Sequence, residues 1–367
     1  MSKSIKRKRM PACLKALILF LMILLLLVVS VFAVYLDKLD RITYADEVED
    51  MYLQQEAEAY QDENSSEIHE ETDVEYHIVI DDLEFQDAPP VVPDTETKVN
   101  DDIFNILLIG TDERTTHYSK SARSDSMILV SINKKLRTVR LVSLERGIGV
   151  PILAGEYQGQ YDLLTHIFRW GGADLLIDTV EHCFKIEVNH YVRLNFAAVK
   201  KIVDVIGGID MELSEREAYG LNEWAVGKDM KVSPGNNRLD GNTALRFARL
   251  RWIDSDWQRV GRQRKVILAV VDELKNSNLS ELNDLADTVL PLIQTNLTKT
   301  EITELVLYAP SFLKSEFDQM TIPKKGTYGG MAIRNGGGAF AVDYEINNDL
   351  LYRFLYEGAS SEELLAE

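Results

Sequence analysis

The amino-acid sequence predicts an α/β fold, in which a central mixed β-sheet is flanked by helices on both faces, with one N-terminal transmembrane helix ahead of it. Two observations predict the sheet: short continuous apolar runs typical of buried strands, and the alternation of these runs with segments of helical periodicity. A third observation, an apolar run of roughly 20 residues near the N-terminus, predicts the membrane span. The chain has 367 residues, of which 46% are hydrophobic, so it can also bury a sizeable core.

The apolar run "LKALILFLMILLLLVVSVFAVYL" places the predicted membrane span at residues 16–36. Residues 1–15 form a basic tail without acidic residues, which the positive-inside rule places in the cytoplasm. A cleaved signal peptide is the alternative, but the run is longer than the apolar region of most signal peptides. In the predicted topology Cys13 and Cys183 lie too far apart to pair, which excludes a disulfide framework. We therefore predict a single-pass bacterial membrane protein whose remaining chain is extracytoplasmic.

An acidic segment follows the predicted span. Over residues 37–102, about 23 Asp and Glu residues stand against only three Lys and Arg residues, and this segment accounts for the formal net charge of -19. Its stretch "DAPPVVPDTETKVND" is typical of an extended linker. We expect an extracytoplasmic stalk here, then a folded domain over residues 103–358 and a C-terminal tail over residues 359–367.

Three short apolar runs predict the first strands of the folded domain. They are "IFNILLIG", "SMILVSI" and "TVRLVSL", at residues 103–110, 126–132 and 138–144. The segment "NKKLR" joins the last two and has a length that suits a hairpin. A helix in "GADLLIDTVEHCF", a strand in "HYVRLN" and a helix in "FAAVKKIVDVI" are expected next, and Gly207-Gly208 is expected to end that helix.

The second half of the domain is predicted to be mainly helical. Helices are expected at residues 240–251, 257–275, 279–294, 300–313 and 345–357. Before the last of them, "KKGTYGGMAIRNGGGAFAVDY" is rich in glycine but lacks the strand-turn-helix context of a phosphate-binding loop. We expect a flexible hairpin region there.

An arginine-rich stretch, "LRFARLRWIDSDWQRVGRQR", spans residues 245–264. The helix that begins near Trp257 carries an apolar stripe at i, i+3, i+4 and i+7 spacing, from Ile267 to Leu274. Projected backwards, this stripe contains Gln263 and has Arg259 and Arg264 on its flanks, whereas Arg262 points away. Since polar residues continue a buried stripe, we expect the stripe to end in a polar pocket. We expect Arg246, Arg262 and Arg264 to be ion-paired or solvated.

Three arginines of this stretch are candidates for binding one anion. Arg249 and Arg251 share a face if the chain turns between the two helices, and both then converge with Arg259. Guanidinium groups grip phosphate oxygens in a bidentate manner, and several of them hold a pyrophosphate. The alternative is that Asp254 and Asp256 neutralise these arginines in surface ion pairs. Interleaved tryptophans would also suit nucleic acid, but an extracytoplasmic domain meets no genomic DNA, so we expect no nucleic-acid partner.

A second group of polar residues lies near the first strands. Asp112 comes just after one predicted strand and Asp125 just before the next, so both are expected at one edge of the sheet. Two carboxylates suit Mg²⁺, which completes its octahedron with water and substrate phosphate oxygens; each aspartate alone is also a common turn residue. Arg123 and Arg146 would add cations beside this site. His166 and His190 are isolated, and we expect structural roles for both.

Five blocks of this sequence resemble the LytR-CpsA-Psr family of cell-wall assembly enzymes. They are "NILLIGTDER", "ARSDSMILVSIN", "VRLVSLERGIGVPI", "LDGNTALRFARLR" and "DSDWQRVGRQRKVI", in this order behind one predicted transmembrane helix. The resemblance implies a phosphotransferase of a Gram-positive cell surface. Such an enzyme transfers an anionic glycopolymer, such as teichoic acid or capsule, from a polyprenyl-pyrophosphate carrier to peptidoglycan, with Mg²⁺ as cofactor and an apolar pocket for the prenyl chain.

By motif position, the resemblance assigns roles to individual residues. Asp112 and Asp125 would bind Mg²⁺. The catalytic residues would be Arg146, Arg249 and Arg259. The pyrophosphate would be bound by Arg123, Arg146, Arg249, Arg251, Arg259 and Gln263. Asp254 and Asp256 both remain candidates for the general base that takes the proton of the acceptor hydroxyl.

Two departures from the family pattern leave alternatives open. The family usually has Arg-Asp where this chain has Arg146-Gly147, and a Lys-Ile-Asn-type segment is replaced by "YDLLTHIF" at residues 161–168. If the missing aspartate normally orients Arg146 or a metal-bound water, activity is weakened or lost. A non-catalytic lipid-binding or regulatory paralogue is therefore one alternative, and a lipid pyrophosphatase is another.

Overall fold

The computed structural model describes residues 35–44, 83–86, 88–113, 122–224, 231–276, 287–312 and 315–366. The predicted membrane span at residues 16–36 lies almost wholly outside these residues, as does much of the predicted stalk. Within the described parts of the chain, no helix is both long enough and apolar enough to cross a membrane.

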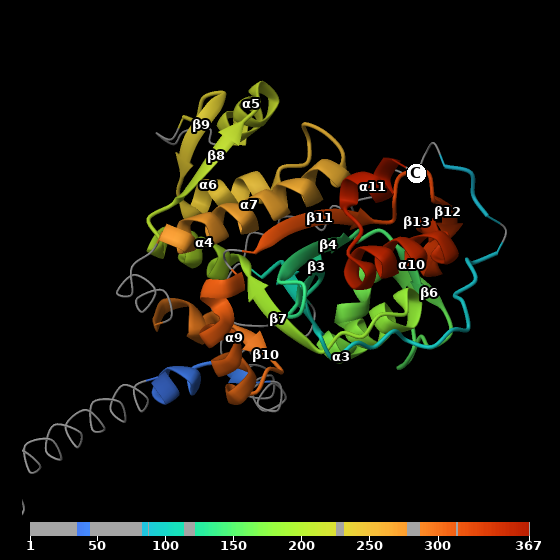
Figure 1. The fold of residues 1–367 in the computed structure, drawn as a ribbon. Coiled ribbons are helices and arrows are strands. Elements are labelled where there is room, and N and C mark those ends of the chain that lie inside the picture. Colours follow the sequence, from blue (N-terminus) through green and yellow to red (C-terminus); the bar gives the residue numbers. More distant parts are fainter. Residues whose placement is uncertain are drawn as a thin grey trace, which may run out of the picture.

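Seven of the described strands form one mixed sheet at the centre of the molecule (Figure 1). In spatial order they are β1 (Thr43–Tyr44), β10 (Gln294–Thr295), β7 (His190–Asn195), β2 (Ile103–Thr111), β3 (Ser124–Asn133), β4 (Thr138–Leu144) and β11 (Glu316–Ile322). β3 is antiparallel to β2 and β4, whereas β7 is parallel to β2 and β11 is parallel to β4. The predicted mixed sheet is confirmed, and so is the predicted hairpin between β3 and β4.

Helices cover both faces of this sheet, as predicted. α3 (Leu164–Phe184) and α10 (Tyr344–Tyr352) pack on the face where Leu129 of β3 is buried in the main core. α7 (Asp256–Asn276) packs on the other face, against the neighbouring residue Ile128. Consecutive residues of β3 point to opposite faces because the strand is pleated, so β3 is buried from both sides.

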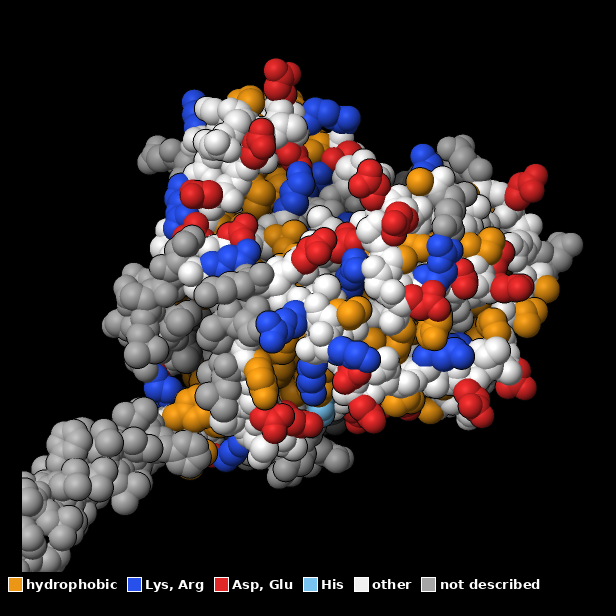
Figure 2. Space-filling view, in the orientation of Figure 1, with side chains coloured by type: hydrophobic (Ala, Val, Ile, Leu, Met, Phe, Trp, Pro, Cys, Tyr) orange, Lys and Arg blue, Asp and Glu red, His pale blue; other side chains and the backbone are white. Residues whose placement is uncertain are grey.

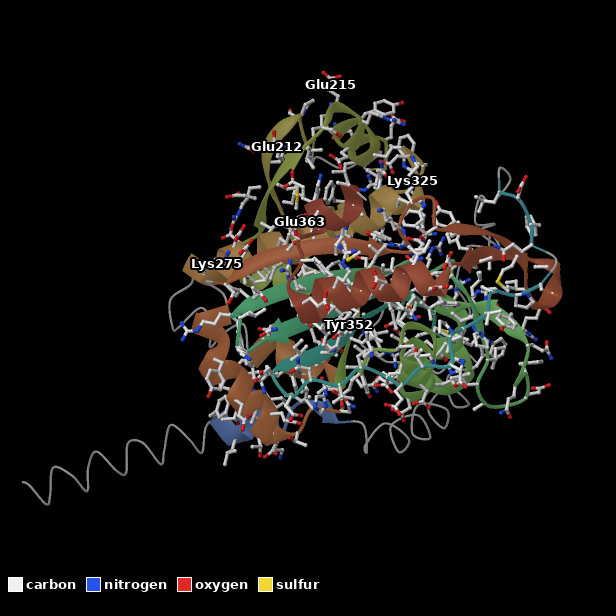
Figure 3. The ribbon with its side chains drawn as sticks, turned by 45° about the vertical axis from the view of Figure 1, so that its right-hand side comes forward. Glu212, Glu215, Lys275, Lys325, Tyr352 and Glu363 are labelled. Atoms are coloured by element: carbon white, nitrogen blue, oxygen red, sulfur yellow. The ribbon has the colours of Figure 1, made fainter. Side chains whose placement is uncertain are left out.

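A smaller core lies beside α7. It is formed by α4 (Phe196–Val205), β8 (Ile209–Leu213), α5 (Glu215–Trp224), β9 (Gly235–Leu239) and α6 (Gly241–Arg249). Figure 1 shows α5, β8 and β9 projecting away from the sheet, and Figure 3 shows the labelled Glu212 and Glu215 on this projection. Gly241 lets α6 approach α4 closely, because a Cβ atom there would lie 2.2 Å from the carbonyl oxygen of Lys200. This contact fixes α6, the helix that ends at Arg249.

Further described elements lie around the sheet, several of them in contact with the main core. They are β5 (Gly149–Pro151), β6 (Tyr161–Leu163), α9 (Lys299–Phe312), β12 (Tyr328–Ala332), β13 (Gly338–Val342) and α11 (Ser361–Ala366). β12 and β13 form an antiparallel hairpin from the glycine-rich stretch, as expected. α11 falls within the segment assigned above to a tail, and its Leu364 is buried in the main core. The predicted helix that Gly207-Gly208 ends is also confirmed, because both glycines adopt positive φ angles after α4.

One helix prediction is wrong at its end. Residues 279–286 of the helix predicted over 279–294 lie outside the described residues, but Gln294 belongs to the strand β10. Gln294 pairs with Arg193 of β7 along the sheet, and its side-chain oxygen accepts a hydrogen bond of 2.9 Å from the Arg193 guanidinium group. Tertiary pairing with β7 therefore overrides the local helical pattern.

We expect Leu129→Ala to lower the free energy of unfolding by about 3 kcal/mol, because Leu129 is fully buried and its truncation leaves a cavity between the sheet and α3. Leu136→Ala is the matched control: this leucine is 52% exposed in the β3–β4 turn, and the change is expected to stay within about 0.5 kcal/mol. Denaturant unfolding of both variants measures the difference. Equal losses in the two variants would contradict the assigned core.

Candidate functional site

The site lies at one edge of the main sheet. Asp112 follows the end of β2, Asp125 is the second residue of β3, and Arg146 follows the end of β4. Because β2 and β4 run in the same direction and β3 runs against both, the ends of β2 and β4 meet the start of β3. β7 is parallel to β2, so its end reaches the same edge.

Asp256, the first residue of α7, is at the centre of the site. Its carboxylate accepts hydrogen bonds from Arg259 Nε (2.6 Å) and Arg259 Nη2 (3.0 Å), and a further one from Arg146 Nε (2.9 Å). Arg251 Nε lies 3.8 Å from the same carboxylate. One aspartate from the second half of the chain therefore orients arginines from both halves.

Asp125, on the sheet side of the site, contacts the same three arginines. Its carboxylate oxygens lie 3.6 Å from Arg146 Nη1 and 3.7 Å from Arg251 Nη2. Its main-chain oxygen accepts a hydrogen bond of 3.1 Å from Arg259 Nη1. The structure thus brings Arg146 together with Arg251 and Arg259, which follow it by more than a hundred residues in sequence.

Asp112 and Arg123 form a second pair at this edge. Asp112 Oδ1 accepts a hydrogen bond of 3.1 Å from the Arg123 main-chain nitrogen, and Asp112 Oδ2 lies 3.5 Å from Arg123 Nε. Both side chains are 30% exposed, so a ligand can reach them. This pair lies between the end of β2 and the start of β3.

Two other candidate residues are placed by the helices. Arg249 stacks over the ring of Phe196 at 4.3 Å, and the Phe196 nitrogen donates to the Glu113 main-chain oxygen, which places Arg249 beside the end of β2. The chain is extended at Leu250, as expected between the two helices, so the direction of the side chains changes after Arg249. Gln263 is half-buried on α7, one turn after Arg259.

The charges of the site act strongly on one another. Burial, followed by the charges of Arg259 and Arg146, lowers the pKa of Arg251 to about 10, so this guanidinium group still carries its charge at neutral pH. Burial alone would raise the pKa of Asp256, but the hydrogen bond with Glu145 and the charge of Arg259 outweigh burial and hold it well below its usual range. Asp256 is therefore a weak general base and a strong partner for arginine.

Glu145 was not among the site residues predicted from the sequence. This residue is 1% exposed, directly precedes Arg146 and forms a side-chain hydrogen bond with Asp256. Burial, followed by the hydrogen bond and charge of Asp256, raises the pKa of Glu145 well above its usual value. The signal was an acidic residue placed directly after the apolar run "TVRLVSL", where the strand leads into the site.

Asp254 and Arg262 form a buried pair behind the site. Both Asp254 oxygens accept hydrogen bonds of 2.7 Å from Arg262, which is 2% exposed. Arg262 is thus ion-paired, as expected, but it is buried rather than on the surface. Arg264 is half-buried, and in place of the expected ion pair it donates hydrogen bonds to neutral groups: Ser143 Oγ at 2.5 Å, Thr321 Oγ1 at 2.8 Å and Gln319 Oε1 at 2.8 Å.

Arg193 is a second buried charge that was not predicted from the sequence. It is fully buried in β7, donates to Gln294 and pairs with Glu113, and its guanidinium group lies 4.7 Å from the centre of the Phe168 ring. An arginine inside the predicted strand "HYVRLN" was the available signal. These contacts hold the ends of β2, β7 and β10 together beside the site.

The two isolated histidines have carboxylate partners away from the arginines. His166 Nδ1 lies 2.8 Å from Asp162, and His190 Nε2 lies 2.9 Å from Glu301. Among the described residues, no group of three or more His, Cys, Asp or Glu side chains is arranged to hold a metal ion. Asp112 and Asp125 offer two carboxylates at one edge of the sheet, a donor set that fits Mg²⁺ when substrate and water supply the other ligands.

One face of the molecule carries surface charges of both signs. Figure 2 shows Lys and Arg side chains interspersed with Asp and Glu side chains over the face it presents. The site arginines belong to a different environment, because Arg259 is 2% exposed and the Arg146 side chain 12% exposed. Positive charge is therefore concentrated inside the site, where water screens it less.

Sequence comparison places this arrangement in a known family. The sequence model of the LytR_cpsA_psr family matches residues 50–351. The chain belongs to the LytR_cpsA_psr family. A relative in this family, polyisoprenyl-teichoic acid–peptidoglycan teichoic acid transferase TagU of Enterococcus faecalis, is 33% identical over 225 residues, which cover 60% of this chain and 71% of TagU.

Two solved structures of LytR_cpsA_psr relatives share the fold. TagT bound to LIIa-WTA superposes with a TM-score of 0.57 and 26% identity, covering 77% of this chain and 98% of that one. The family protein YwtF (TagT) with bound octaprenyl pyrophosphate lipid superposes with a TM-score of 0.53 and 25% identity, covering 73% and 96%. The predicted family and its sheet-and-helix fold are therefore confirmed.

We expect Arg262→Met to lower the free energy of unfolding by about 3 kcal/mol, because it removes the buried guanidinium partner of the half-buried Asp254 carboxylate. Lys265→Met on the same helix is the matched control. Lys265 is 53% exposed and lies 3.8 Å from Glu217, so its loss should cost less than about 1 kcal/mol. Denaturant unfolding measures both, and an unchanged Arg262→Met variant would refute a structural role for this pair.

Proposed function

We propose that this protein transfers an anionic glycopolymer from a polyprenyl-pyrophosphate carrier to peptidoglycan on the outer face of the cell membrane. The observation that carries the proposal is the convergence of Arg146, Arg251 and Arg259 around Asp125 and Asp256. Three guanidinium groups against two carboxylates leave positive charge for a pyrophosphate. The substrate class and the lipid carrier are proposed from the relatives: TagU is named a teichoic acid transferase, and YwtF holds octaprenyl pyrophosphate.

The reaction is a phosphoryl transfer. A hydroxyl oxygen of peptidoglycan forms a bond to the phosphorus that carries the glycopolymer, the bond from that phosphorus to the bridging oxygen breaks, and polyprenyl phosphate leaves with the electron pair. The hydroxyl proton passes to a base or to water. Such transition states need positioning and charge stabilisation more than covalent chemistry. Arg146, Arg251 and Arg259 are placed to bind the phosphates and to stabilise charge on the leaving phosphate.

The arginines do not need an aspartate at position 147. Asp256 and Asp125 already orient Arg146, through contacts of 2.9 Å and 3.6 Å. This geometry supports an active enzyme over a non-catalytic paralogue. Neither Asp254 nor Asp256 is assigned as the general base. Asp254 is bound to Arg262. Burial would raise the pKa of Asp256, but the Glu145 hydrogen bond and the charge of Arg259 keep that pKa low.

Mg²⁺ is the proposed cofactor, with Asp112 and Asp125 as its protein ligands. Its chemistry would be to neutralise charge on the pyrophosphate. The proposed topology, with the predicted span at residues 16–36 as membrane anchor, puts the site beside the lipid carrier and the cell wall.

We expect Arg251→Ala to slow transfer by about 100-fold, because a preorganised donor to the leaving phosphate is lost. Arg246→Ala, from the same stretch of sequence, is the control and should retain the parent rate. The assay incubates the full chain in detergent with a lipid-linked oligosaccharide pyrophosphate, peptidoglycan oligomers and Mg²⁺, and quantifies the joined product. Absence of product with the parent protein would refute the proposal, and phosphate release without acceptor would favour the pyrophosphatase.

Chelation of divalent cations is expected to abolish transfer, and Mg²⁺ is expected to restore it. Asp125→Asn should raise the Mg²⁺ concentration needed for half-maximal rate by about tenfold, because one of two protein ligands is weakened. Asp174→Asn, at an exposed position of α3, serves as the control. Transfer that persists at full rate in chelator would show that no metal is required.

A further inference from the structure

Glu145 is an acidic group in contact with Asp256 to which the proposed function gives no role. Its main-chain nitrogen donates to the Ile322 carbonyl oxygen at 2.9 Å, which fixes the backbone between β4 and β11. From this position its buried side chain reaches Asp256 at the start of α7. Two carboxyl groups are therefore in contact inside a site built for an anion.

Two carboxyl groups in contact do not both ionise readily. Asp256 keeps its charge, because Arg146 and Arg259 donate hydrogen bonds to it. Glu145 has no such support: its Oε2 atom is buried without a hydrogen-bond partner. An ionised Glu145 would be a buried charge with an unsatisfied oxygen, which is costly. The geometry therefore favours a Glu145 that keeps its proton and donates a hydrogen bond to Asp256.

The surroundings of Glu145 contain few other groups that could hold its charge. Arg146 is its neighbour in the chain, and Arg259 and Arg264 face it from α7. Tyr328 faces it from β12, where its ring stacks on Trp257 at 5.5 Å. The aromatic rings limit access of water. The charges of Arg146 and Arg259 are already shared with Asp256 and Asp125, and Arg264 donates its hydrogen bonds to neutral side chains.

We propose that the proton on Glu145 sets the charge of the phosphate site, so that the site binds pyrophosphate when Glu145 is protonated and loses affinity when it ionises. This inference rests on the proposed function. With Glu145 neutral, Arg146, Arg251 and Arg259 exceed Asp125 and Asp256 by one positive charge, three against two. Ionised Glu145 cancels that excess. Glu145 is thus a positioning residue that acts through Asp256 and the arginines.

Infrared difference spectroscopy tests the protonation without reference to function. The full chain in detergent is compared with Glu145→Gln, in which the amide replaces the acid as donor to Asp256 and cannot ionise. We expect a protonated-carboxyl band at neutral pH that the variant lacks. Glu301→Gln, a change at a half-exposed residue of α9, should retain the band. Absence of the band from the parent protein overturns the inference.

Binding of farnesyl pyrophosphate, measured by calorimetry from acidic pH to about pH 9, the upper range documented for buried glutamates, tests the consequence. We expect the ratio of parent Kd to Glu145→Gln Kd to rise about tenfold over this range, because one charge is added next to the bound anion. Because both proteins bind the same ligand, the ratio of their Kd values cancels the effect of the ligand's own titration. The Glu301→Gln protein should follow the parent at every pH.

The two failures are distinguishable. A constant Kd ratio, with tight binding in both proteins, overturns control by Glu145 and leaves the proposed function intact. If none of the proteins binds the ligand at any pH, both the proposed function and the proposed effect of Glu145 on binding are overturned. This holds even where the infrared band shows that Glu145 is protonated.

Thermal unfolding adds a readout independent of ligand. A raised pKa in the folded state means that the proton on Glu145 stabilises the fold at low pH, and that this stabilisation is lost as pH rises through the folded-state value. The Tm of the parent should therefore fall more steeply towards alkaline pH than that of Glu145→Gln. Parallel curves would overturn the inference.

Discussion

Asp256 joins the two halves of the molecule by accepting hydrogen bonds from Arg146, at the end of β4, and from Arg259, on its own helix α7. Neither arginine could be buried to this extent without a carboxylate partner, because an unpaired buried charge is costly. The position of α7 on the sheet and the shape of the phosphate site therefore depend on the same carboxylate. Glu145 completes this arrangement from the sheet side by supplying a hydrogen bond without a second negative charge.

A site for a pyrophosphate has to remain positive while being packed tightly enough to hold its arginines in place. Carboxylates provide the packing, but each one removes a unit of positive charge. The site resolves this conflict by using only two ionised carboxylates for three arginines and by keeping the third carboxyl group protonated through burial. The neighbouring Arg262 shows the contrast: it is matched by Asp254 and supports the loop between α6 and α7.

Much of the site could be predicted because its residues lie where strands and helices begin and end. Asp112, Asp125 and Arg146 adjoin strands that their apolar runs reveal, and the directions of those strands place all three at one edge. Which arginines face the site, and which pair elsewhere, was harder to predict from the sequence. Arg259 and Arg262 are three residues apart on one helix and both are buried, yet one faces the site and the other faces Asp254. The short strand β10 was also missed, because Gln294 is held by β7 and Arg193 rather than by its own neighbours in sequence.

The sequence by itself determined the family, the mixed sheet with helices on both faces, and the residue types that meet at its edge, because periodicity and ordered motifs are local properties. Only the tertiary structure decided which charges are paired and which carboxyl group keeps its proton. Protonation depends on burial and on the distances to other charges. For Glu145 these are set by segments more than a hundred residues away, at Asp256 and Tyr328.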